Sequence, residues 1–138
     1  MHSIGTKRAR GLAALATMGL VMAAPVLTAG SAQAKEGRVV ERGNCSQAST
    51  WKLKAQPDNG RLEIDFDVDS NVVGQVWQVT VTANGTTVFS GPATTVAPSG
   101  SFDVGAVADD QPGTDSIQAT AIRDDGSETC WGGLNYNN

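Results

Sequence analysis

The chain has 138 residues, of which 14 are acidic, 10 are basic and one is histidine, and its formal net charge at pH 7 is −4. The histidine, all three methionines and three basic residues lie within residues 1–34; without that segment, 104 residues with seven basic and 14 acidic side chains remain, a net charge of −7. This balance excludes histidine chemistry and argues against nucleic acid as a partner, because phosphate surfaces are bound by clustered Lys and Arg.

Residues 1–34 have the three parts of a secretory signal peptide. A basic segment ends at Arg10, an apolar run follows, and the small-residue cleavage motif Ala32-Gln33-Ala34 comes last. A retained membrane anchor is the alternative, but no later stretch is long and apolar enough to span a bilayer. We therefore expect a cleaved signal peptide over residues 1–34 and a single secreted, extracellular domain over residues 35–138, with no membrane contact after cleavage.

The chain has two cysteines, Cys45 and Cys130. Thiols oxidise outside the cell, so we predict one intramolecular disulfide, Cys45–Cys130. In the chain-entropy model a loop of this length contributes about 4–5 kcal/mol, which is comparable with the net stability of a small domain. Two free thiols or an intermolecular bond are the alternatives.

Alternation of apolar and polar residues predicts antiparallel strands from residue 36 onward. Residues 36–43 contain a first short strand, and a hairpin then joins residues 51–55 to residues 62–66 across the four-residue loop Pro57-Asp58-Asn59-Gly60. Its register places apolar side chains on one face and opposite charges on the other. The predicted pairs are Gln56–Arg61, Leu53–Ile64, Trp51–Phe66, Lys54–Glu63 and Lys52–Asp65.

A second hairpin joins residues 76–83 to residues 86–90 and turns on Asn84-Gly85, the strongest short hairpin signal. It carries Trp77 on its core face and places Val81 opposite Val88. Residues 100–108 form a further strand, and a loop over residues 109–114 follows.

The third hairpin joins residues 116–124 to residues 127–134 and turns on Asp125-Gly126. No segment after residue 34 has a helical repeat, so we expect about eight strands in an all-β fold. An antiparallel two-sheet sandwich of immunoglobulin or fibronectin-III type with one disulfide fits a chain of this length. The predicted pairs of the third hairpin are Arg123–Glu128, Ala121–Cys130 and Ile117–Leu134.

Two resemblances accompany this pattern. The motifs Cys45-Ser46-x-x-Ser49-x-Trp51-Lys52-Leu53-Lys54, Phe66-Asp67-Val68-Asp69-Ser70-Asn71-x-x-Gly74-Gln75-x-Trp77 and Pro98-Ser99-Gly100-Ser101-Phe102 resemble a family of small secreted actinobacterial proteins of unassigned function. The stretch Gly113-x-Asp115-x-Ile117-x-Ala119-x-Ala121, with Asp125-Gly126, is similar to the last hairpin of bacterial immunoglobulin-like domains. The first resemblance implies secretion, the second implies the sandwich fold, and neither supplies catalytic residues.

An acidic strand offers one candidate metal site. Asp67 and Asp69 are expected to face Thr50 and Ala48 without a basic partner, and with Asn71 they form an Asp-x-Asp-x-Asn pattern of oxygen ligands suited to calcium. The spacing departs from the helix-loop-helix calcium loop, so a solvated acidic face is the favoured interpretation and we expect no cofactor.

Trp131 is the candidate anchor of a binding surface. Because Cys130 must point inward to reach Cys45, strand alternation turns Trp131 outward beside Thr120 and Gln118, and Tyr136 is expected to extend the patch. An exposed indole with polar neighbours suits a sugar or a protein partner. The alternative is that the N-terminal segment or the Asn-rich tail packs over Trp131 and buries it.

The function expected from these features is binding without catalysis. No histidine remains to act as a base and the disulfide removes both thiols as nucleophiles, so we do not expect an enzyme. We expect a secreted binding module for an extracellular glycan or protein, and the alternative is a structural or cell-surface interaction protein of the extracellular matrix. The sequence does not define the oligomeric state.

Overall fold

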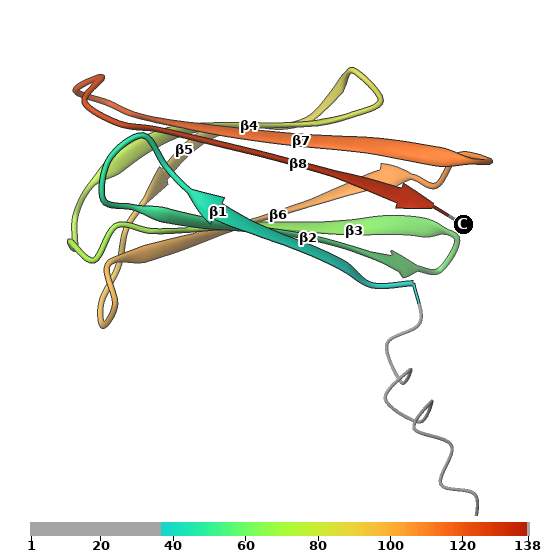
Figure 1. Cartoon of the computed structure of the whole chain (residues 1–138), viewed down its shortest axis with the longest axis horizontal. Helices are drawn as coiled ribbons and strands as arrows, with labels where there is room; N and C mark the ends of the chain where they lie inside the picture. Colours follow the sequence, from blue (N-terminus) through green and yellow to red (C-terminus); the bar gives the residue numbers. More distant parts are fainter. Residues whose placement is uncertain (1–36, 138) are drawn as a thin grey trace, which may run out of the picture. The chain divides into compact units, whose positions relative to one another are not determined.

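The structure is a computed structural model, and it describes residues 37–137, which form two four-stranded antiparallel sheets packed face to face (Figure 1). The all-β sandwich with one disulfide is therefore confirmed, whereas the predicted signal peptide lies outside the described residues. One sheet has the order β1-β2-β3-β6 and the other has the order β5-β4-β7-β8. The strands are β1 (Val39–Asn44), β2 (Thr50–Asp58), β3 (Arg61–Asp69), β4 (Val76–Ala83), β5 (Thr86–Thr94), β6 (Ser101–Asp109), β7 (Thr114–Arg123) and β8 (Thr129–Asn137).

The connectivity follows the immunoglobulin arrangement in both sheets, with one additional strand at an edge. The order β8-β7-β4-β5 is the G-F-C-C′ order of a variable-type immunoglobulin sheet. With β4 as strand C, the two preceding strands β2 and β3 take the places of strands A and B, and β3 pairs directly with β6, as strand B pairs with strand E in an immunoglobulin sheet. The additional strand of this sheet is β1, which lies at its outer edge beside β2.

The core lies between the two sheets and follows the alternation of every strand. Trp77 of β4 is fully buried and meets Phe102 of β6 from the opposite sheet, with ring centroids 6.3 Å apart. Aliphatic side chains fill the space around them. The largest fully buried apolar side chains are Trp77, Phe66, Leu53, Leu62, Ile64, Ile117, Val68, Val79 and Val81.

Trp51 packs at one edge of this core, against β1 and β8. A Cβ atom added to Gly43 of β1 or to Gly132 of β8 would lie 2.7 Å from the indole ring of Trp51. Real Cβ atoms do not approach that closely, so both positions need glycine to hold the ring. The indole is half-buried and packs against the core, as expected.

The first hairpin has the predicted faces but not the predicted register. Asn59 and Gly60 both have positive φ, 50° and 78°, which is the conformation of a two-residue type I′ turn rather than a four-residue loop. The two strands therefore continue to Asp58 and Arg61, and every pair shifts by two residues. The observed pairs are Asp58–Arg61, Ala55–Ile64, Lys54–Asp65, Leu53–Phe66, Lys52–Asp67 and Trp51–Val68.

The second hairpin contains an irregularity that the sequence did not show. Its register shifts between Val81 and Thr82, so that Val81 lies opposite Phe89 rather than the predicted Val88. An extra residue in one strand of a pair has this effect in a β-bulge. The third hairpin has the predicted register, with Ala121 opposite Cys130 and Ile117 opposite Leu134.

Candidate functional site

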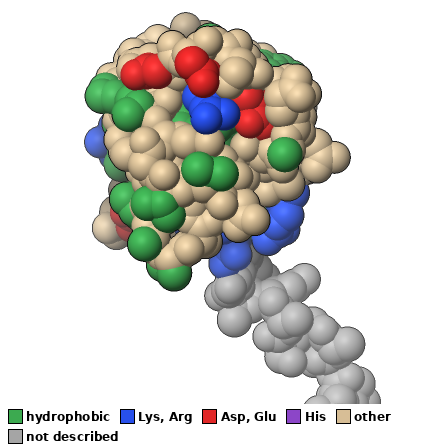
Figure 2. Space-filling model, turned by 90° about the vertical axis from the view of Figure 1, so that its left-hand side faces the viewer, with side chains coloured by type: hydrophobic (Ala, Val, Ile, Leu, Met, Phe, Trp, Pro, Cys, Tyr) green, Lys and Arg blue, Asp and Glu red, His purple; other side chains and the backbone are tan. Residues whose placement is uncertain are grey.

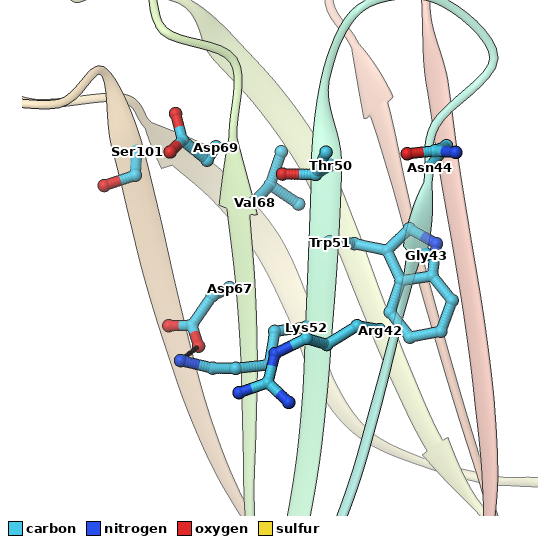
Figure 3. A pocket seen from close by; sticks show the side chains of 10 residues that line it. All are labelled: Arg42, Gly43, Asn44, Thr50, Trp51, Lys52, Asp67, Val68, Asp69 and Ser101. Carbon is cyan, nitrogen blue, oxygen red and sulfur yellow. Dashed lines mark ion pairs between the residues drawn. The ribbon is translucent and has the colours of Figure 1, made fainter.

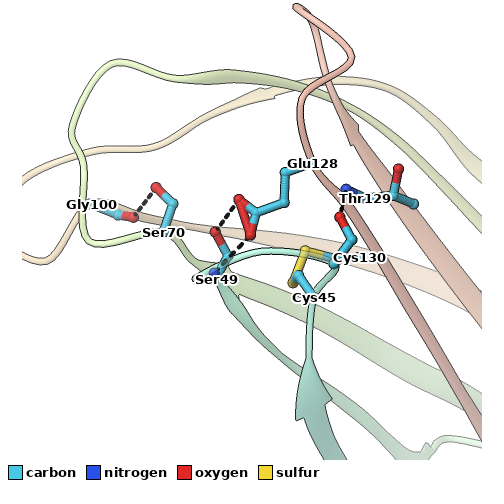
Figure 4. The surroundings of a disulfide bond; sticks show 8 residues. Cys45, Ser49, Ser70, Gly100, Glu128, Thr129 and Cys130 are labelled. Atoms are coloured by element: carbon cyan, nitrogen blue, oxygen red, sulfur yellow. Dashed lines mark hydrogen bonds between the residues drawn. A yellow bond between two sulfur atoms is a disulfide. The ribbon is translucent and has the colours of Figure 1, made fainter.

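The disulfide confirms the predicted pairing and determines which way the candidate site faces. Cys45, just after β1, bonds to Cys130 of β8, and their Cα atoms are 4.2 Å apart (Figure 4). Cys130 therefore points into the sandwich. Its neighbour Trp131 must point to the outside of the sheet, because successive side chains of a strand alternate.

A buried carboxylate next to the disulfide holds the loop between β1 and β2 against β8. Glu128 is almost fully buried and accepts hydrogen bonds from the backbone N–H of Ser49, at 2.7 Å, and from its hydroxyl, at 2.9 Å (Figure 4). The backbone N–H of Ser46 donates to Thr129 at 2.8 Å. This network was not predicted from the sequence, where its one signal is the inward parity that Glu128 shares with Cys130. The role of Glu128 is structural, since both oxygens of its carboxylate accept hydrogen bonds from Ser49.

Trp131 is exposed, as its parity predicts. Its relative exposure is 59%, the largest among the exposed large apolar residues of the described chain. A Cβ atom added to Gly133 would lie 3.6 Å from the outer edge of the indole ring, so the ring leans over Gly133 along β8. The ring is thus supported by the strand and open to solvent.

The neighbours of Trp131 on its own sheet are uncharged. Thr120 lies directly opposite Trp131, and Thr80 follows in the same row on β4. Gln118 and Ile122 of β7 have the same parity and are exposed, as predicted. We call the outer side of the sheet β5-β4-β7-β8 the uncharged face. Its central side chains are Gln78, Thr80, Thr82, Ser90, Gln118, Thr120, Ile122, Thr129 and Trp131.

A groove of about 440 Å³ runs beside the indole and is called the Trp131 groove below. Glu41 of β1 reaches it from the other sheet and is the one charged residue among those that line it. Within residues 37–137, the Glu41 carboxylate makes no ion pair or hydrogen bond. The lining consists of Glu41, Ser116, Ile117, Gln118, Trp131, Gly133, Leu134 and Asn135.

Tyr136 does not extend this surface, which corrects the expectation from sequence. It is only 4% exposed and belongs to the core, because it has the inward parity of Cys130 and Leu134. Burial raises the pKa of its hydroxyl, and the carboxylates of Asp110 and Asp115 raise that pKa further.

Two of the three candidate calcium ligands, Asp67 and Asp69, already make other contacts. Asp67 forms an ion pair with Lys52 at 2.6 Å, within a groove of about 580 Å³ (Figure 3). Asp69 accepts a hydrogen bond from the backbone N–H of Asn71 at 2.9 Å, a local turn contact. The expectation that Asp67 has no basic partner is wrong, because the two-residue turn moves it opposite Lys52 and moves Asp69 opposite Thr50. Among residues 37–137 no group of three acidic, histidine or cysteine side chains is arranged to hold a metal ion.

The outer side of the sheet β1-β2-β3-β6, called the charged face below, pairs its charges across strands. Lys54 contacts Asp65 at 2.5 Å beside the pair of Lys52 and Asp67. Asp103 of β6 lies opposite Asp67. Its pKa is raised, first by burial and then by the charges of Asp67 and Asp65. This face therefore satisfies most of its charges internally.

Comparison with known proteins assigns neither a family nor a function to the chain. No protein-family model matches the sequence, and the curated proteins contain no match to it. Residues 37–137 contain no helix of the length and hydropathy needed to cross a membrane.

Proposed function

We propose that the domain is a secreted, non-catalytic binding module whose ligand is a carbohydrate that stacks on Trp131. The observation that carries the proposal is the position of the indole: it is 59% exposed, yet it lies on a strand and over Gly133 rather than at the tip of a loop. A rigid apolar plane in a fixed orientation loses little conformational entropy when a ligand covers it.

The surroundings of the ring match the two sides of a sugar. The apolar C–H face of a pyranose packs on an indole, while its hydroxyl groups need hydrogen-bond donors and acceptors at the rim. Gln118 and Asn135 line the Trp131 groove and can supply both from their amides. The volume of about 440 Å³ lies in the range of small-molecule sites.

The negative charge of the protein indicates which class of saccharide the Trp131 groove would bind. Glu41 lines the Trp131 groove without an ion-pair partner, and the chain from residue 35 onward has a net charge of −7. Both features disfavour acidic sugars, because like charges repel at short range. We infer a neutral or amine-bearing saccharide.

Binding without turnover is the simpler interpretation of the same site. Hydrolysis of a glycosidic bond usually requires two carboxyl groups on either side of that bond. Glu41 is the one carboxylate among the residues that line the Trp131 groove. Both thiols are held in the disulfide.

Calorimetric titration with soluble chito- and cello-oligosaccharides tests the proposal. We expect saturable binding that Trp131→Ala weakens by at least about tenfold, or about 1.4 kcal/mol, because the sugar loses the aromatic plane on which it packs. Trp131→Phe should retain part of the affinity. Val107→Ala is the matched control, because Val107 is also an exposed apolar residue but lies on the charged face. Equal affinities of the wild type and Trp131→Ala would refute the site.

A protein-interaction role has separate support at the end of the domain that Figure 2 shows, where hydrophobic side chains reach the surface. Val72 and Val73, between β3 and β4, and Val96, between β5 and β6, are all more than half exposed. The hydroxyl of Thr95 donates to the carbonyl of Val72 at 2.6 Å, so the two loops are tied together. If this patch mediates assembly, sedimentation should show concentration-dependent association that Val72→Ser with Val73→Ser removes and Trp131→Ala leaves unchanged.

A further inference from the structure

Two turns of the molecule have the same sequence and the same backbone geometry. Asn59-Gly60 joins β2 to β3, and Asn84-Gly85 joins β4 to β5. The φ angles are 50° and 78° in the first turn and 51° and 79° in the second. Any chemistry that depends only on the dipeptide and its φ angles would affect both turns equally.

The side chains of the two asparagines are held very differently. The amide nitrogen of Asn84 donates to the buried carboxylate of Asp115 at 2.6 Å, and the amide oxygen of Asn84 accepts from the backbone N–H of Ser116 at 2.8 Å. The amide of Asn59 makes one exposed contact, 3.3 Å long, with its neighbour Asp58. Asn84 is therefore fixed at both ends of its amide, whereas the amide of Asn59 is held by a single exposed contact.

This difference bears on deamidation. The backbone nitrogen of a following glycine can attack the side-chain carbonyl carbon of asparagine, because glycine has no side chain to obstruct the approach. A bond forms between that nitrogen and Cγ, the bond from Cγ to Nδ2 breaks, and the nitrogen's proton leaves with the amide as ammonia. Water then opens the five-membered imide at either carbonyl, which leaves aspartate or isoaspartate. No electrons are exchanged with an oxidant or reductant.

We propose that Asn59 is a site of spontaneous deamidation in the folded protein and that Asp115 and Ser116 protect Asn84 from the same reaction. To bring its Cγ to the nitrogen of Gly85, Asn84 must break both hydrogen bonds and leave the buried carboxylate of Asp115 without that donor. Asn59 gives up only an exposed contact with its neighbour.

The reaction would change the end of the hairpin of β2 and β3. Isoaspartate adds one backbone atom to a two-residue turn, and the pairing of Asp58 with Arg61 depends on that turn length. Aspartate instead adds a negative charge beside Asp58. The secreted protein would thus carry an age-dependent modification far from Trp131 in the sequence and on the other sheet.

Incubation of the purified protein at mildly alkaline pH, followed by tryptic peptide mapping with mass spectrometry, tests the proposal. Cleavage after Lys54, Arg61 and Arg123 places Asn59 in the peptide 55–61 and Asn84 in the peptide 62–123. In folded protein, we expect the first peptide to convert to aspartyl and isoaspartyl forms at least about tenfold faster than the second, the order of effect expected for two lost hydrogen bonds. In urea, where neither turn is formed, both peptides should convert at similar rates.

Asp115→Ala supplies the matched variant. It removes the acceptor of the Asn84 amide, and in folded variant protein we expect the peptide 62–123 to react faster than in the wild type. If this variant does not fold, the deamidation rates of Asn59 and Asn84 in folded and in urea-unfolded wild type still test the proposal. Equal rates at the two sites in the folded wild type, or an unreactive Asn59 in folded protein that reacts in urea, would overturn the proposal.

Discussion

The two outer faces of the sandwich are built from the same alternation but differ in chemistry. The charged face pairs Lys52 with Asp67 and Lys54 with Asp65, so its charges are matched within the protein. The uncharged face carries hydroxyl and amide groups around the exposed indole of Trp131. A surface whose polar groups already contact one another must lose those contacts to bind a ligand, whereas the uncharged face can use its groups directly.

The side chains of both outer faces are expected to contribute little to the free energy of folding. Exposed ion pairs contribute about 0.2–1 kcal/mol each, and a surface indole contributes little to folding. The free energy of folding comes instead from the core between the sheets and from the bridge at one end. Substitutions on the two faces should therefore change binding and pH dependence more than they change stability.

The largest effect is expected when the disulfide between Cys45 and Cys130 is removed. Cys45→Ser with Cys130→Ser should lower the free energy of unfolding by about 4–5 kcal/mol, because the unfolded chain regains the freedom of a long loop. Urea denaturation of the variant and of the wild type measures the difference. Intact mass with and without reductant is the control, and a wild-type mass that reductant does not change would contradict the bridge.

The second effect compares the inner and outer sides of one strand. Trp51→Ala should cost about 2–4 kcal/mol, since it empties the space beside Gly43 and Gly132. Lys52→Ala, one residue away on the charged face, should cost less than about 1 kcal/mol. Chemical denaturation measures both variants, and a larger loss for Lys52→Ala would show that the assignment of the two sides is wrong.

The third effect tests the exposed ring on the uncharged face. Iodide should quench part of the tryptophan fluorescence of the wild type, and Trp131→Phe should remove most of that accessible fraction, because Trp77 is buried and Trp51 is half-buried. The free energy of unfolding should change by less than about 0.5 kcal/mol. If Trp131→Phe leaves the fraction of fluorescence that iodide can quench unchanged, Trp131 is shielded from solvent.

The fourth effect concerns the carboxyl group of Asp103, which lies opposite Asp67 on the charged face. Because the pKa of Asp103 is raised above its ordinary value of 3.8, the folded state binds more protons than the unfolded state between the two pKa values, and stability falls as pH rises through that window. Asp103→Asn should therefore raise the melting temperature at pH 7 by a small amount. The gain should vanish well below pH 3.8, where both states are protonated, and a lower melting temperature at pH 7 would contradict the stated cause.

The smallest effect is expected from calcium. Asp67 already contacts Lys52, and Asp69 accepts the N–H of Asn71, so titration with millimolar calcium should produce little heat and no rise in melting temperature. Lys52→Met is the matched variant, because it frees the Asp67 carboxylate. A clear calcium-dependent rise in the wild type would restore Asp67, Asp69 and Asn71 as a metal site.

Much of the fold could be predicted because it depends on local pattern. Alternation identified the strands and their inner sides, and the turn at Asp125-Gly126 determined the register of β7 and β8. The register of β2 and β3 could not be predicted in the same way: a four-residue loop and a two-residue turn keep the same faces, and only the backbone at Asn59 and Gly60 distinguishes them. The expectation that Tyr136 extends the patch is wrong, because β8 continues to Asn137 and Tyr136 has the inward parity of Cys130 and Leu134.

By itself, the sequence determined which residue types are present from residue 35 onward, the single possible intramolecular disulfide and the side of the strand on which Trp131 lies. Those properties depend on composition and on a period of two, which are local. The tertiary structure alone decided that Glu41 reaches the Trp131 groove, that Glu128 is buried against Ser49, and that Gly43 and Gly132 hold Trp51. Each of these contacts joins residues distant in the chain, and only the packing of one sheet on the other brings them together.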